Sequence, residues 1–346
     1  MTYISSSSMT SPLRSSILNA QSALTQAQTE VSTGTYADIG LQLGGGTGHL
    51  LSLRSNVDAL NTYTQTNAVA STRLSATDTA LTAMLSTAQT LSATLTSAQS
   101  SGSSLTGLAQ AGQGALEGLI GGLNTSAGGQ FVFAGTATQT TPIADYTATS
   151  SAKSAVETAF QAYLTANGVT ASTISGSQMQ SFLSNQFASL FSSGGWQSSW
   201  SSASSQTMTT SITPSQTAST SVSANQGAFQ TMAQAYTMLT EFTGDGMSAD
   251  AKAAVVATAG KLVSTGIAGL TEVQAGVGVT QTAISQANTQ IGAQTTLLSS
   301  SATNLDSVDT YALSSQVTQL QTQLEASYSL TSRLQQLSLV NYLTAG

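Results

Sequence analysis

The clearest pattern in the chain is at residues 306–346, DSVDTYALSSQVTQLQTQLEASYSLTSRLQQLSLVNYLTAG. Apolar residues recur there at intervals of three and four, the heptad-like repeat of a helix with one apolar stripe. The stripe contains Leu313, Val317, Leu320, Leu324, Leu334 and Leu337. Because a stripe of this width is buried only against another helix, the pattern predicts a C-terminal helix that needs a partner.

The N-terminal region supplies a candidate partner. Ile17, Leu24 and Val31 are seven residues apart, with Ala20 and Ala27 between them. This is the same three-four repeat, so we expect the two ends of the chain to pair as a coiled coil. The residues between the two ends then form one long region that connects them.

The composition favours slender helices. Only 6% of the 346 residues are charged, aromatic residues make up 5%, and the 40% that are hydrophobic include many alanines. Alanine promotes helix formation but buries little area, so thin seams are expected in place of a thick core. The net charge is −7 and the seven basic residues are scattered, which argues against binding to nucleic acid or to an anionic membrane surface.

The sequence contains no recognisable set of catalytic, metal-binding or phosphate-binding residues. The absence of cysteine removes disulfides and thiolate sites, and the single histidine, His49, has only Asp38 and Asp58 near it in sequence. The loop at 44–48 lacks the lysine of a phosphate-binding loop, so we interpret it as a hinge. We therefore predict no enzyme, no metal and no cofactor. We also expect no cleaved signal peptide in residues 1–10 and no membrane insertion.

The predicted fold is mostly α: a long helical bundle formed by paired N- and C-terminal regions, with a small inserted α+β outer domain. The expected parts are an N-terminal coiled-coil segment (1–40), the two halves of a helical bundle (41–142 and 225–304), the insert (143–224) and a C-terminal coiled-coil segment (305–346). The insert holds both tryptophans and many of the phenylalanines, which we interpret as its own aromatic core.

Local signals give the expected elements. Ser11 and Pro12 predict the start of a first helix that stops at Gly34, followed by a loop over 36–47. Further helices are expected at 48–100, 105–126, 153–166, 177–191 and 225–239, and glycines predict that 251–305 is divided near residue 279. Residues 130–135 favour a short strand, and 207–223 favour a hairpin around Pro214.

Several stretches resemble the flagellin superfamily of axial proteins, and within it the hook-filament junction (hook-associated protein 3) family of alphaproteobacterial type. The stretches are QSAL (21–24), EVSTG (30–34), DIGLQLG (38–44), LSLR (51–54), GQFVFAGT (129–136), LQTQLEASY (320–328) and LSLVNYL (337–343). The motif at 129–136 resembles the one that closes the first half of junction proteins. The Gly-rich loop after the first helix departs from the commoner flagellin pattern.

The resemblance implies a structural subunit of the bacterial flagellum, located outside the cell after export through the flagellar type III apparatus. Its implied partners are a neighbouring hook-associated protein, flagellin, copies of itself in a ring or helical lattice, and a cytoplasmic export chaperone on the C-terminal helix. The nine residues of the N- and C-terminal stripes would form the assembly and chaperone interface. A filament flagellin and a soluble helical adaptor with a closed monomeric bundle stay open as alternatives.

Overall fold

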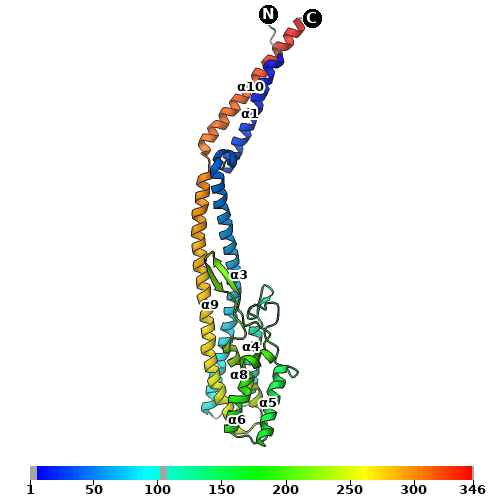
Figure 1. The fold of residues 1–346 in the computed structure, drawn as a ribbon, viewed down its shortest axis with the longest axis vertical. Coiled ribbons are helices and arrows are strands. Elements are labelled where there is room, and N and C mark those ends of the chain that lie inside the picture. Colours follow the sequence, from blue (N-terminus) through cyan, green and yellow to red (C-terminus); the bar gives the residue numbers. More distant parts are fainter. Residues whose placement is uncertain (1–5, 102–106, 345–346) are drawn as a thin grey trace. The chain divides into compact units, whose positions relative to one another are not determined.

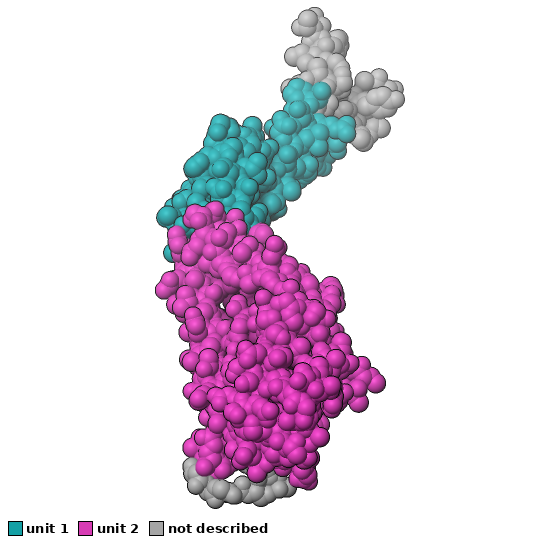
Figure 2. Space-filling view, turned by 60° about the horizontal axis from the view of Figure 1, so that its bottom comes forward, with its two compact units in different colours: residues 1–61, 292–346 teal, residues 62–291 magenta. Residues whose placement is uncertain are grey.

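The computed structural model describes residues 6–101 and 107–344, with the side chains of 6–10, 100, 101, 334 and 337–344 outside that description. The chain divides into two compact units (Figure 2): unit 1 comprises residues 1–61 and 292–346, and unit 2 comprises residues 62–291. Long helices dominate and the sheets are two-stranded, which confirms the mostly α fold class (Figure 1). The finer five-part division stays a prediction.

Unit 1 is built from helices at the two ends of the chain. It contains α1 (Ser6–Thr33), α2 (Ile39–Leu43), a 3-10 turn η1 (Gly44–Gly46), the first part of α3 (Thr47–Ser101), the last part of α9 (Ala249–Asp306) and α10 (Thr310–Thr344). Two local expectations were wrong. Pro12 lies inside α1, which begins at Ser6. The expected loop at 36–47 contains α2, because the Asp38 side chain caps it by accepting from the Leu41 N–H at 2.9 Å.

The long helices α3 and α9 provide the seam of unit 2. Among the buried positions on α3, one set recurs every seven residues, and α9 has a similar set. On α3 they are Asn67, Leu74, Leu81, Ala88 and Leu95. On α9 they are Val256, Val263, Leu270, Val277 and Ile284. The prediction of one helix near 48–100 is confirmed by α3.

The expected division of 251–305 was wrong, because α9 runs unbroken from Ala249 to Asp306. Two of its glycines allow close packing: a Cβ on Gly266 would lie 2.8 Å from the Met232 side chain, and one on Gly269 would lie 2.9 Å from the Ala228 Cβ. Close contact with the neighbouring helix thus offsets the helix-weakening effect of glycine, roughly 1 kcal/mol per residue.

Helix α9 is also long and apolar enough in composition to be a candidate membrane span, with a mean hydropathy of 1.5 over its most apolar 18-residue window. One third of that window is buried within the protein. A single such helix is weak evidence for a span, and the apolar side chains of α9 are already used in the seam with α3.

The rest of unit 2 packs beside this seam. Its remaining elements are α4 (Leu108–Leu123), β1 (Ser126–Ala127), β2 (Gln130–Phe131), α5 (Ser151–Asn167), α6 (Gly176–Phe182), a π-helical turn η2 (Leu183–Phe187), α7 (Ser193–Ser199), β3 (Thr209–Thr213), β4 (Gln216–Ser219) and α8 (Gly227–Phe242). The strand expected over 130–135 is reduced to β2, which pairs with β1. The helix expected over 177–191 is present as α6 continued by the π-helical turn η2, and the hairpin around Pro214 is confirmed by β3 and β4.

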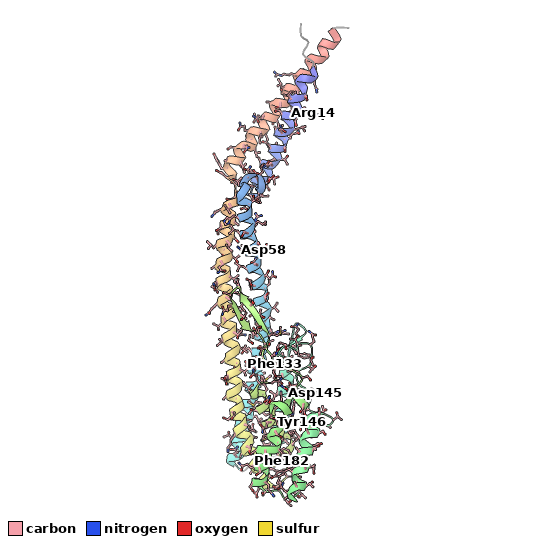
Figure 3. The ribbon with its side chains drawn as sticks, in the orientation of Figure 1. Arg14, Asp58, Phe133, Asp145, Tyr146 and Phe182 are labelled. Atoms are coloured by element: carbon pink, nitrogen blue, oxygen red, sulfur yellow. The ribbon has the colours of Figure 1, made fainter. Side chains whose placement is uncertain are left out.

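Residues 143–224 contribute an aromatic core, as the sequence predicts. Phe182 lies within 6 Å, centroid to centroid, of four other rings, and Trp196 stacks on Trp200 at 5.4 Å. Figure 3 shows Tyr146 and Phe182 in the region of the short helices. Phe182 also meets Phe242 of α8 at 5.6 Å, so this core is continuous with the helical bundle of unit 2.

Candidate assembly interface

The two end helices of the chain, α1 and α10, pack side by side in unit 1 (Figure 1). Gln21 on α1 donates a hydrogen bond from Nε2 to the Tyr328 hydroxyl on α10 at 2.5 Å. These two residues are 307 positions apart in the sequence. The pairing of the two ends that the heptad spacing predicts is therefore present in the structure.

The predicted stripe residues lie on the two helices of this pair, but most of their described side chains are only half-buried. Leu324 is buried, with 6% of its surface exposed. The half-buried positions are Ile17, Leu24, Val31, Leu313, Val317 and Leu320. The side chains of Leu334 and Leu337 lie outside the described residues. Two helices without a third thus leave part of the seam accessible, at every described stripe position except Leu324.

Further large apolar side chains of unit 1 are exposed, and the spacing analysis did not select them. Leu18 on α1 is 57% exposed, Leu330 on α10 is 50% exposed and Tyr311 is 84% exposed. Others are Leu41, Leu51 and Leu297. Single exposed apolar residues are common on soluble proteins, and these six are spread over α1, α2, α3, α9 and α10. Period-based reasoning misses such residues because they lie off the seam.

The segments that join α1 to α2 and α9 to α10 are bonded to each other, and we call the residues 34–36 with 306–308 the clasp. Thr35 and Ser307 form an antiparallel bridge. The Tyr36 N–H donates to the Asp306 carbonyl at 3.1 Å, and the Val308 N–H donates to the Gly34 carbonyl at 3.1 Å. The clasp fixes where the α1–α10 pair begins.

Two carboxylates reinforce the clasp. Asp306 is 5% exposed and pairs with Arg54 of α3 at 2.5 Å. Glu30 is also 5% exposed, and its Oε1 accepts from the Ala37 N–H and from Gln26 Nε2, each at 3.1 Å. Buried carboxylates are stable when they are paired in this way. The partner of Asp306, Arg54, is 252 residues away in the sequence, so no local pattern reveals this pair.

The strongest electrostatic cluster of unit 2 joins α5 to α8. Lys153 Nζ lies 2.7 Å from Glu241 Oε1 and 3.3 Å from Glu157. The Tyr146 hydroxyl donates to the same Glu241 oxygen at 3.0 Å, and burial together with Glu241 raises the pKa of Tyr146. Burial by itself lowers the pKa of Lys153, but the bonds and charge of Glu241 outweigh it and the pKa is raised. The raised pKa values keep Tyr146 neutral and Lys153 positively charged at neutral pH, which suits a structural role.

No group of three or more metal-ligating side chains occurs among the described residues. His49 is exposed on α3. A shallow groove of about 530 Å³ in unit 2 runs along α9 beside the start of α8 and the end of the hairpin. Its lining includes three glycines and the carboxylate of Glu272, with no second titratable side chain. This lining offers no acid–base pair for catalysis.

Comparisons with known proteins agree with this architecture. Residues 4–138 match the bacterial flagellin N-terminal helical region, and residues 261–343 match the bacterial flagellin C-terminal helical region. The two matched regions together cover more than half of the chain, and they contain α1 and α10 almost completely. No curated protein sequence matches the chain.

A solved structure from Vibrio parahaemolyticus, provisionally assigned as a flagellar hook-associated protein, has the same fold. It superposes with a TM-score of 0.51 and 12% sequence identity, covering 75% of this chain and 97% of that one. At this identity the likeness concerns the fold alone. The chain belongs to the flagellin superfamily, as its two family regions show. It is thus a structural component of the bacterial flagellum.

Proposed function

We propose that the protein joins a hook-associated protein to the flagellin filament, and that it assembles through the α1–α10 pair. The observation that carries this proposal is the incomplete burial of the predicted stripe: of its described side chains only Leu324 is buried, while the other six are half-buried. Neighbouring subunits would cover the remaining surface, which would stabilise the pair by mass action. The partners would be the adjacent hook-associated protein, flagellin and further copies of the chain.

A seam that is incompletely buried in the free chain would also need protection before assembly. The exposed apolar residues of α10 are a suitable surface for the cytoplasmic export chaperone that the family resemblance implies. Export would follow the flagellar type III route without a cleaved signal peptide. The chaperone would cover the stripe residues of α10 that later take part in the assembly interface.

The proposed interface can be tested with charge substitutions on α10. Leu324→Asp, or Leu320→Asp, places a carboxylate in an apolar seam and is expected to abolish assembly while unit 2 stays folded. Gln323→Asp is the matched control, because it adds the same charge at an exposed neighbouring position. Normal flagella from cells that carry either seam variant would refute the mechanism.

The position of the protein in the flagellum needs a separate measurement. Isolated flagella would be labelled for immunogold electron microscopy with antibody against residues 153–213 of unit 2. A narrow band between hook and filament is expected for the junction role. Label along the whole filament would identify a filament flagellin, and unlabelled flagella would favour the soluble adaptor. The resemblance of residues 129–136 to the junction motif favours the first outcome.

A further inference from the structure

One layer of the α3–α9 seam in unit 2 is polar. Asn67 occupies a position in the seven-residue repeat that leucine or alanine fills elsewhere on α3, and it is fully buried. A buried asparagine in a helical seam costs stability and is retained where it specifies one arrangement over others. Its contacts show which arrangement it specifies.

The carboxamide of Asn67 connects three elements. Its Nδ2 donates to Asn288 Oδ1 on α9 at 2.8 Å and to the Ile212 carbonyl on β3 at 3.0 Å. Because a backbone carbonyl can only accept, the bond to Ile212 fixes which end of the Asn67 amide faces the hairpin. The opposite end, Oδ1, is buried without a hydrogen-bond partner.

The hairpin is shaped to reach this amide. The β3–β4 pairing is regular from Thr209 to Ser211, then shifts register before Thr213, which leaves Ile212 as the extra residue of a bulge. A bulge frees one residue from the ladder and turns it toward another part of the protein. Here the Ile212 side chain is fully buried and its carbonyl accepts from Asn67. Figure 1 shows the hairpin lying along α3 and α9.

We propose that Asn67, oriented by Asn288, is the docking residue that holds the hairpin β3–β4 on the α3–α9 seam, and that the bulge at Ile212 exists to present its carbonyl to Asn67. The unpaired Oδ1 means that the amide weakens the seam in which it lies. The contribution of the amide is therefore to hairpin positioning and not to seam stability. Removing the amide therefore has opposite effects on the two: the hairpin is released, while the seam keeps or gains stability.

The test is hydrogen–deuterium exchange of the full-length chain, measured by mass spectrometry on peptides covering residues 209–219 and on peptides of α3. The variants are Asn67→Leu, which fills the layer with an apolar side chain, and Asn67→Ser, which is too short to reach Ile212. The matched control is Thr77→Val. Thr77 is another fully buried polar residue of α3, but its hydroxyl bonds to the Arg73 carbonyl of its own helix. Circular dichroism checks that each variant is helical.

In both Asn67 variants the hairpin peptides are expected to exchange faster, by about tenfold for the loss of one hydrogen bond. The α3 peptides are expected to keep their protection in Asn67→Leu, and Thr77→Val is expected to leave the hairpin unchanged. Unchanged hairpin exchange in either helical Asn67 variant would overturn the proposal. The same acceleration in Thr77→Val would also overturn it, since any polar loss from the seam would then suffice.

Discussion

The substitution Leu324→Ala measures how much the thin seam of α1 and α10 contributes to the free chain. Leu324 is 6% exposed, whereas the other described members of the predicted stripe are half-buried. Truncation of a buried leucine to alanine costs about 2–5 kcal/mol, and the cost falls when surrounding groups can collapse into the space. Half-exposed neighbours in a two-helix pair can move inward, so we expect the lower end, about 2 kcal/mol.

The matched control is Leu330→Ala on the same helix, where the leucine is 50% exposed. Removing this side chain from solvent-facing surface should change the stability of the free chain by roughly 0.5 kcal/mol or less. If Leu330 is covered by a neighbouring subunit, the same variant should nevertheless assemble poorly. The two variants thus separate the stability of the pair from its function in assembly.

Urea denaturation followed by two signals distinguishes the units. Trp196 and Trp200 both belong to unit 2, so tryptophan fluorescence reports unit 2, while far-ultraviolet circular dichroism also includes α1 and α10. Unfolding of the α1–α10 pair should change the dichroism signal but not the tryptophan fluorescence. Leu324→Ala should lower the urea midpoint of this transition. Equal losses of stability in Leu324→Ala and Leu330→Ala would refute the view that the seam through Leu324 holds the pair together.

Three further changes test the packing of unit 2. Arg73 is 7% exposed, has no carboxylate partner among the described residues and donates to the Gln130 side chain. Gln130→Glu should therefore stabilise the protein by about 1 kcal/mol in urea denaturation at pH 7. This gain should be lost at acid pH, because the new carboxylate is then protonated. Because the pKa of Lys153 is raised in the folded state, its pairing with Glu241 contributes stability that is complete below the unfolded pKa of about 10.4. This stability is lost as the pH rises through the folded pKa. The thermal midpoint should therefore fall in that alkaline range, and it should fall less in Glu241→Gln. Gly135→Ala should destabilise by roughly 2 kcal/mol or more in thermal denaturation, since Gly135 has a φ of 61° and an added Cβ would meet two backbone carbonyl oxygens.

Periodicity was sufficient to predict the long helix α3 and the pairing of the chain ends. A heptad repeat is a local property, which can be recognised in a short window of sequence such as Leu313 to Leu324. The unbroken course of α9 could not be predicted in this way. Gly266 and Gly269 weaken a helix by propensity, and their value becomes visible only when Met232 and Ala228 of α8 pack against them.

The candidate interface was predictable to the same extent. The stripe residues follow from spacing, but the clasp depends on contacts between segments about 270 residues apart, such as Thr35 with Ser307. The hairpin was expected from turn residues around Pro214. Its proposed docking residue, Asn67, was not selected, because it is a polar residue in a repeat that was identified by its apolar members. Long-range polar contacts leave no periodic trace, so they had to come from the structure.

Assembly through α1 and α10, as proposed, would account for the low charge of the chain. Exposed threonines on the two end helices bond to their own backbone: Thr25 donates to the Gln21 carbonyl at 3.0 Å and Thr318 donates to the Ser314 carbonyl at 3.0 Å. A hydroxyl that is already bonded within its helix loses little when another chain covers it, whereas a charged side chain must be desolvated at a cost of several kcal/mol. Hydroxyls therefore keep α1 and α10 hydrated in the free chain and still allow close packing between subunits. A surface of lysine and glutamate would serve the first requirement and oppose the second.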